Sequence, residues 1–272
     1  PEEMTETDIA DHAADAVEAS PITDVYMVGR RGPIEAKFTN VELREMGKLD
    51  DCLPVIDAAQ LPDAVEGDWS DRDKRLKDRN LATMKEFPDV DPADKSKRVH
   101  FTFYAKPIEI LGGDKVEGIR MEHTRVEDGR SVGTGEFFEI ECGLVIPAIG
   151  YFSDPFPGVP FDVDNGVVEH DEGRVGDGVY AVGWIKRGPT GVIGTNRPDG
   201  QQAAKQILED IAAGSKPGRE ALEAAIAKNG GRIVSYDDWL TLDAHEKAAA
   251  REGAPREKLI TVAAMLGVLD GA

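Results

Sequence analysis

The sequence predicts an α/β protein, and three features of the chain lead to this prediction. An apolar strand at Asp24–Val28 lies between two stretches with helical periodicity, residues 7–19 and 39–48. A second strand at residues 178–183 leads through a Gly-rich turn into another helix. Three alternating segments between residues 100 and 149 predict an antiparallel β meander.

The remaining elements follow from local composition. The polar stretch between residues 63 and 97 predicts one helix over residues 71–86 and a loop over residues 88–97. The meander strands are expected at residues 100–104, 115–125 and 135–149, with turns at residues 112–114 and 128–129. The last helix of this region, which ends at Gly214, is expected to present one apolar face made of Ala203, Ala204, Ile207, Leu208 and Ile211.

Two arginines directly follow the first strand. Gly29 stops the strand, and Arg30 and Arg31 come next. At such a strand end an acidic side chain accepts hydrogen bonds from the ribose of NAD, whereas arginine favours the 2′-phosphate of NADP. Guanidinium matches phosphate oxygens in a bidentate fork. The pair therefore indicates NADP(H) selection, with two solvated arginines on a turn as the alternative.

The second signal is the Gly-rich segment from Trp184 to Asn196. Gly188, Gly191 and Gly194 would let main-chain N–H groups approach a flat or anionic ligand. The following helix would direct its positive end at the same place. On this segment alone, an ordinary strand-to-helix turn explains the glycines equally well.

Several ordered blocks of the sequence resemble one family, the adrenodoxin reductase type of ferredoxin-NADP reductase. The resemblance covers nearly the whole chain and is much more specific than a lone Gly-rich turn. The matching blocks are residues 28–33 (VGRRGP), 38–45 (FTNVELRE) and 183–196 (GWIKRGPTGVIGTN), followed by Trp239, Leu242, Asp243, Glu246, residues 255–259 and residues 265–266.

The resemblance implies cofactor-binding roles for residues in both halves of the chain. Arg30 and Arg31 would hold the 2′-phosphate, and Glu42 would contact the NADP side of the cleft. Glu45 lies one helical turn from Glu42, so the two carboxylates share a face that could line the nicotinamide pocket. A solvated acidic stripe is the alternative for these glutamates.

The flavin contacts are implied in the second half. Trp184 and the backbone of Gly191, Val192 and Ile193 would contact the flavin ring, with Gly191 also close to the nicotinamide; a plain core aromatic is the alternative for Trp184. Hydride transfer needs no general acid or base from the protein, so no catalytic side chain is assigned. No histidine has a metal-ligand spacing, so no metal site is expected.

The chain departs from the family in one respect: neither its Gly-x-Gly-x-x-Gly turn for the FAD pyrophosphate nor its second Gly-rich turn for the NADP pyrophosphate is present. The chain therefore resembles the C-terminal portion of a longer reductase: parts of two Rossmann-like dinucleotide-binding domains of the three-layer ββα type, with residues 1–146 from the NADP-binding domain including the meander and residues 147–272 from the FAD-binding domain. Disulfide reductases of the wider superfamily need paired cysteines, but Cys52 and Cys142 are far apart and are expected to be buried structural thiols.

The function implied by the resemblance is that of a flavin-dependent ferredoxin-NADP reductase. The parent enzyme would bind FAD and NADP, transfer a hydride between NADPH and FAD, and pass single electrons to a ferredoxin-type iron–sulfur protein. The chain by itself is expected to be inactive. Two alternatives remain: a structural piece without bound cofactor, and an electron-input subunit resembling the small subunit of glutamate synthase.

Composition limits the partners. With 52 Asp and Glu against 32 Lys and Arg, the formal net charge is -20, which disfavours nucleic acid and anionic membranes. No stretch approaches the ~18 apolar residues of a membrane helix. We therefore expect no membrane insertion and a cytoplasmic location. Two basic clusters could face an acidic ferredoxin, although solvated faces are the favoured interpretation. They are Lys74, Arg75, Lys77 and Arg79, and Lys95, Lys97 and Arg98.

Overall fold

The computed structural model describes residue 4 and residues 6–191, 193–212 and 214–271. The chain forms two compact units, called here the first unit (residues 1–145 with 244–272) and the second unit (residues 146–243). Each is described by itself.

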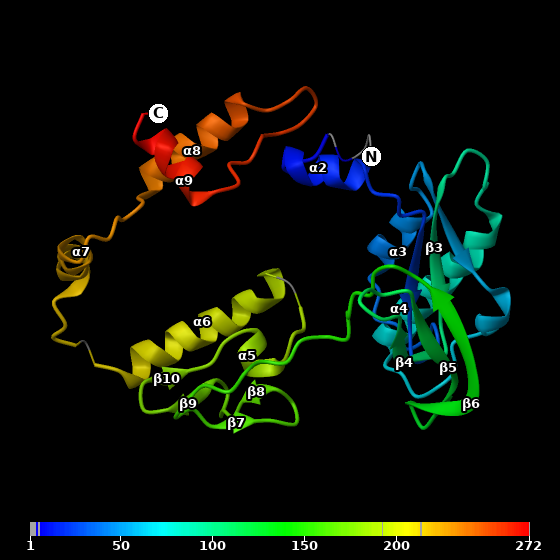
Figure 1. The fold of residues 1–272 in the computed structure, drawn as a ribbon. Coiled ribbons are helices and arrows are strands. Elements are labelled where there is room, and N and C mark those ends of the chain that lie inside the picture. Colours follow the sequence, from blue (N-terminus) through cyan, green and yellow to red (C-terminus); the bar gives the residue numbers. More distant parts are fainter. Residues whose placement is uncertain (1–3, 5, 192, 213, 272) are drawn as a thin grey trace. The chain divides into compact units, whose positions relative to one another are not determined.

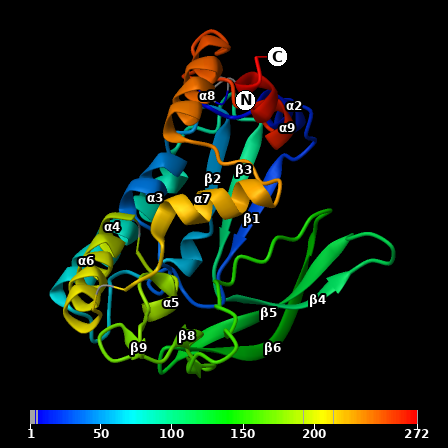
Figure 2. The same cartoon turned by 90° about the vertical axis from the view of Figure 1, so that its left-hand side faces the viewer.

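A three-stranded parallel sheet forms the centre of the first unit (Figure 2). Its strands are β1 (Asp24–Val28), β2 (Cys52–Ile56) and β3 (Lys97–Thr102), in the order β1-β3-β2. The prediction that residues 100–104 open the meander is therefore wrong, because most of this segment belongs to the middle strand of the parallel sheet. Alternating polarity reveals a strand but not its partner, so the sequence pattern could not separate the two sheets.

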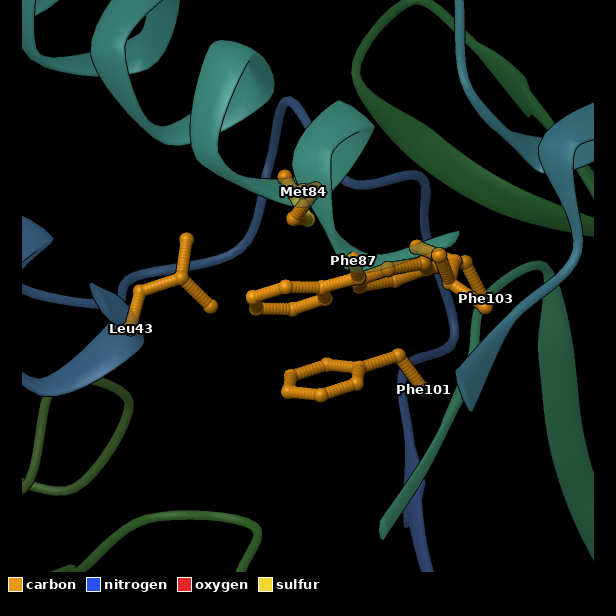
Figure 3. Close-up of a cluster of buried hydrophobic side chains, with 6 residues drawn as sticks. Leu43, Met84, Phe87, Phe101 and Phe103 are labelled. Atoms are coloured by element: carbon orange, nitrogen blue, oxygen red, sulfur yellow. The ribbon is translucent and has the colours of Figure 1, made fainter. Parts of the chain in front are cut away.

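One face of this sheet is covered by α3 (Asn40–Met46) and α4 (Asp71–Glu86). Leu43, Met84, Phe87, Phe101 and Phe103 form the core between them (Figure 3). The Phe101 side chain is only 2% exposed, and its ring centroid lies 5.2 Å from that of Phe87. The predicted helix over residues 71–86 is confirmed, and the short 3-10 helices Ala58–Gln60 and Phe87–Asp89 complete the connections.

The antiparallel meander consists of β4 (Ala105–Leu111), β5 (Gly118–Glu127) and β6 (Arg130–Glu141) (Figure 1). Strand β4 was not predicted from the sequence, because Pro107 and the charged residues of this strand interrupt the apolar alternation. The third strand ends at Glu141, whereas a strand to residue 149 was expected. Cys142 follows it and, like Cys52, is partly exposed, so the expectation of buried thiols is wrong for both.

The first unit is completed by α2 (Asp11–Glu18), the end of α8 (Tyr236–Ala248) and α9 (Val262–Leu269). Arg251 joins the two ends of the chain, since its Nη1 lies 2.6 Å from a carboxylate oxygen of Asp11 and 2.6 Å from one of Glu257. Helix α2 is shorter than the predicted 7–19, because residues 7 and 9 contribute their carbonyl groups to Arg251.

The strands of the second unit are short, with two or three residues each. Two antiparallel pairs are made by β7 (Phe161–Asp162) with β8 (Val167–Val168) and by β9 (Arg174–Gly176) with β10 (Val179–Tyr180). Helices α5 (Trp184–Arg187), α6 (Ile193–Asp210) and α7 (Gly218–Lys228) follow. Of the predicted strand 178–183, only Val179–Tyr180 is extended. On α6, Ala203 is buried but Leu208 is 84% exposed, so the expected apolar face is not covered within this unit.

Truncating the central ring of the first unit should destabilise it strongly. We expect Phe101→Ala to lower the free energy of unfolding by about 3–5 kcal/mol, because it removes a buried ring and leaves a cavity. Urea denaturation followed by circular dichroism measures this. Phe137→Ala removes a ring that is 56% exposed and should cost about 1 kcal/mol or less; equal costs for both variants would contradict this core.

Asp51 should make stability depend on acidity. The Ser96 amide N–H and hydroxyl donate to its carboxylate at 2.7 and 2.8 Å, and with Lys97 they lower its pKa from 3.8 to about 2. A depressed folded-state pKa means that the stabilisation is present above the ordinary pKa and is lost as the pH falls towards 2. Between about pH 5 and pH 2, the melting temperature of Asp51→Asn should therefore fall less than that of the wild type. The exposed Asp68→Asn should follow the wild-type profile, and identical profiles for all three proteins would refute the assignment.

Candidate functional site

Residues 29–33, here called the arginine turn, directly follow β1. Three backbone hydrogen bonds attach it to the junction of β3 and β4. The Gly29 N–H donates to the Thr102 carbonyl at 2.8 Å, and the Ala105 N–H donates to the Gly29 carbonyl at 3.1 Å. The Tyr104 N–H donates to the Arg31 carbonyl at 3.1 Å. The backbone that carries both arginines is thus fixed by the crossing from one sheet to the other.

Tyr104 lies against the arginine turn in an unusual backbone conformation. Its φ of 53° is in the left-handed region, which a bulky residue adopts only where its surroundings require it. A Cβ on Gly32 would overlap the Tyr104 hydroxyl, so this close approach requires glycine. Burial, with a smaller contribution from Glu35, raises the pKa of the Tyr104 phenol. The ring and the glycine together fix the path of the turn.

Both guanidinium groups of the arginine turn are at the surface. The Arg31 Nη1 donates to the Gly129 carbonyl at 3.2 Å, in the turn between β5 and β6. Arg30 and Arg31 are adjacent in the sequence, and two guanidinium groups on a fixed backbone could offer several N–H donors to an anion such as a phosphate.

The two predicted glutamates lie on α3, one helical turn apart and both exposed. The Glu42 carboxylate accepts from the Thr39 N–H at 3.3 Å and from the Thr39 hydroxyl at 2.5 Å, and the Glu42 N–H donates back to that hydroxyl. This capping box explains why the helix begins here. It gives Glu42 a structural role that was not predicted from the sequence, while Glu45 faces solvent.

In the second unit, the predicted flavin-contacting residues surround the start of α6. The Trp184 side chain is 46% exposed, its Nε1 donates to the Gly191 carbonyl at 3.3 Å, and its ring lies beside Tyr151 at a centroid distance of 6.1 Å. Gly191 has a φ of 83°, which L side chains rarely adopt. Val192 and the side chain of Ile193 lie outside the described residues.

Asp199 organises this segment, a role that was not predicted from the sequence. Its carboxylate accepts from Arg187 Nε at 2.7 Å, from Lys186 Nζ at 3.3 Å and from the Gly183 N–H at 3.3 Å. Arg187 and then Lys186 lower its pKa. The side chain is only 14% exposed. Lys186 and Arg187 are adjacent in an otherwise uncharged turn. This pattern in the sequence could have predicted an acidic partner for them.

Other polar groups have structural partners. His100 Nε2 lies 2.8 Å from an Asp24 carboxylate oxygen, and its ring stacks on Tyr26 at 4.4 Å. In the first basic cluster, Lys77 donates to the Ile34 carbonyl and lies over the Trp69 ring.

In the part of the chain that the structure describes, no three His, Cys, Asp or Glu side chains form a metal-binding group. No described helix is long and apolar enough to cross a bilayer.

Comparison with known proteins places this geometry in context. No family model matches the sequence. The mitochondrial NADPH:adrenodoxin oxidoreductase of Rattus norvegicus is 38% identical over 99% of the chain, and the NADPH-ferredoxin reductase FprA of Mycobacterium tuberculosis is 37% identical over 98%. A solved structure of M. tuberculosis FprA in complex with NADPH covers 98% of the chain at 35% identity, with a TM-score of 0.85. The chain is homologous to adrenodoxin reductase-type ferredoxin-NADP reductases.

The chain spans about six tenths of these reductases: 59% of the rat protein and 62% of FprA. The match confirms the predicted fold class, α/β with parts of Rossmann-like dinucleotide-binding domains and an antiparallel meander. The cofactor roles of individual residues stay predictions, as does the assignment of residues 1–146 and 147–272 to NADP and FAD. The compact units differ from that division, because residues 244–272 join the first unit.

Removing the Asp199 carboxylate should loosen the segment that it organises. Asp199→Ala leaves the cations of Lys186 and Arg187 without their shared acceptor, so we expect faster amide hydrogen exchange across residues 183–191. Asp199→Asn, which keeps one acceptor oxygen, should give an intermediate rate. Glu209→Ala on the same helix removes only an exposed pair with Lys205 and serves as the control. Unchanged exchange in Asp199→Ala would show that the ion pairs do not order this segment.

Proposed function

We propose that this chain supplies the NADP-binding part and the flavin-contacting part of a ferredoxin-NADP reductase. The single observation that carries the proposal is the arginine turn, which presents Arg30 and Arg31 together at the end of β1. Homology over nearly the whole chain to NADPH-dependent reductases supports it. In this proposal residues 1–146 belong to the NADP-binding domain and residues 147–272 to the FAD-binding domain.

The described residues of the first unit fit the 2′-phosphate of NADP. Both guanidinium groups are exposed, whereas the carbonyl groups of Arg30 and Arg31 accept hydrogen bonds from Thr124 and Tyr104. A phosphate would therefore meet donors rather than carbonyl oxygens. Arg30 and Arg31 would each donate to it, and Glu42 and Glu45 would border the same side of the nucleotide.

The second unit fits a flat ring. Trp184 offers an exposed indole beside Tyr151, and the positive φ of Gly191 lets the backbone approach a ring closely. We propose that the Trp184 side chain and the backbone of Gly191, Val192 and Ile193 contact the flavin. The amino end of α6 would place its partial positive charge beside the ring.

The chemistry itself belongs to the cofactors: when bound, NADPH supplies a hydride, and FAD accepts it and releases electrons singly. The residues of this chain bind and orient the cofactors. Arg30 and Arg31 select the phosphorylated nucleotide, Asp199 keeps the Gly-rich segment in place, and Trp184 limits water at the ring. No described side chain has to accept or donate a proton.

The proposed electron acceptor is a ferredoxin-type iron–sulfur protein in the cytoplasm. The relatives are named for adrenodoxin and for ferredoxin. The net charge of -20 would repel an acidic acceptor at long range. Docking would therefore depend on local basic groups, for which Lys74, Arg75, Lys77 and Arg79 are one candidate set and Lys95, Lys97 and Arg98 another.

The exposure of one segment favours a second candidate function. Ile146, Ile149, Tyr151 and Phe152 are each more than 70% exposed within the chain. Large apolar side chains in this state indicate a surface that another polypeptide or a cofactor covers. The chain on its own would then be a structural piece without catalysis. Absence of flavin absorbance near ~450 nm in the purified chain, with catalysis only in a longer protein, would support this candidate.

Reversing one charge of the arginine turn should change the choice of nucleotide. In the FAD-loaded reductase we expect Arg31→Glu to lower kcat/KM for NADPH by about 100-fold, because a carboxylate replaces a phosphate-binding guanidinium, and to lower that for NADH by less than about threefold. Steady-state kinetics with both nucleotides measures the ratio. Arg72→Glu makes the same charge change on the exposed side of α4 and should leave the ratio unaltered. An equal loss with both nucleotides would contradict the 2′-phosphate assignment.

A further inference from the structure

Thr124 connects the meander to the arginine turn. It lies in β5, is only 6% exposed, and follows a β-bulge between residues 122 and 124. Its hydroxyl donates to the Arg30 carbonyl at 2.8 Å, and its N–H donates to the Tyr104 carbonyl at 2.8 Å. One buried residue therefore holds both the turn and the strained tyrosine that supports it.

These bonds set the direction of two peptide dipoles. The Arg30 carbonyl is directed at Thr124 and the Arg31 carbonyl at Tyr104, so both oxygens are engaged by donors within the protein. A carbonyl oxygen directed outward would place a partial negative charge beside the arginine side chains and would repel an anion. Because the Thr124 hydroxyl fixes the Arg30 peptide, it also limits the directions in which the flanking side chains can leave the backbone.

The β5–β6 turn makes a third contact. The Gly129 carbonyl accepts from Arg31 Nη1 at 3.2 Å, so the same hairpin that carries Thr124 also orients one guanidinium group. The meander thus contacts the arginine turn through its first strand, its second strand and its hairpin turn.

We propose that Thr124 is a positioning residue for 2′-phosphate recognition: its hydroxyl orients the Arg30 peptide so that the two arginines converge on one phosphate. The inference rests on the proposed function and extends it to a residue in a different sheet. Thr124 itself does not touch the nucleotide. Its contribution should therefore appear only in the part of the affinity that depends on the 2′-phosphate.

The test uses two nucleotides that differ by that group alone. The chain is titrated with adenosine 2′,5′-bisphosphate and with adenosine 5′-monophosphate, and dissociation constants are obtained from amide chemical shifts. Thr124→Val, which keeps the shape and removes the hydroxyl, should weaken bisphosphate binding by about three- to tenfold and change monophosphate binding by less than about twofold. Thr124→Ser should restore wild-type selectivity, and Thr124→Cys, with a weak donor, should lie between them.

A matched control lies in the neighbouring strand. Thr134 in β6 donates its hydroxyl to the His123 carbonyl at 3.0 Å and does not contact the arginine turn. Thr134→Val should leave the affinity for both nucleotides unchanged. Thermal unfolding by circular dichroism checks that each variant is folded at the titration temperature, and Thr124→Cys carries the test if Thr124→Val is not.

The outcomes separate this inference from the function on which it rests. A wild-type chain that does not prefer the bisphosphate would overturn the 2′-phosphate assignment and this inference with it. A wild-type preference that survives unchanged in Thr124→Val and Thr124→Cys would overturn only the role of Thr124. Equal weakening of both nucleotides, or the same selective loss in Thr134→Val, would also overturn it, because either result indicates a general structural effect.

Discussion

Hydrogen bonds between residues 29–31 and residues 102–105 hold the end of β1 against the junction of the two sheets in the first unit. Thr102 ends the middle parallel strand, and three residues later Ala105 begins the meander. Gly29 is bonded to both of these residues. The chain therefore cannot change the angle at which it leaves the parallel sheet without also moving the arginine turn. The core around Phe101 anchors one side of this junction, and the meander anchors the other.

This arrangement explains how the arginine turn can be held in one conformation although it lies at the surface. Exposed turns are usually mobile because their backbone groups bond to water rather than to the protein and because they lack packing partners. Here the backbone is satisfied by Tyr104, Ala105 and Thr124. The left-handed backbone of Tyr104 is the local cost of this order. In the second unit Asp199 orders the Gly-rich segment, through ion pairs with Lys186 and Arg187 rather than through contacts with a second sheet.

The sequence predicted the parts of the fold that depend on local patterns. Strand β1 and helix α4 have the predicted bounds, because an apolar run stopped by glycine and a capped polar helix are local signals. The pairing of β3 with β1 and β2, instead of with the meander, was not predicted, because partner choice depends on the core around Phe101. Arg30 and Arg31 could be predicted as candidate site residues because they directly follow β1. Thr124, Tyr104 and Asp199 were not found, because their importance arises from contacts between residues far apart in the sequence.

A crystal structure of the chain with NADP+ would test the proposal that Arg30 and Arg31 together bind the 2′-phosphate. We expect phosphate oxygens within about 2.7–3.2 Å of both guanidinium groups, while the Arg30 and Arg31 carbonyls keep their bonds to Thr124 and Tyr104. A 2′-phosphate bound elsewhere on the chain, with both arginines directed into solvent, would contradict it.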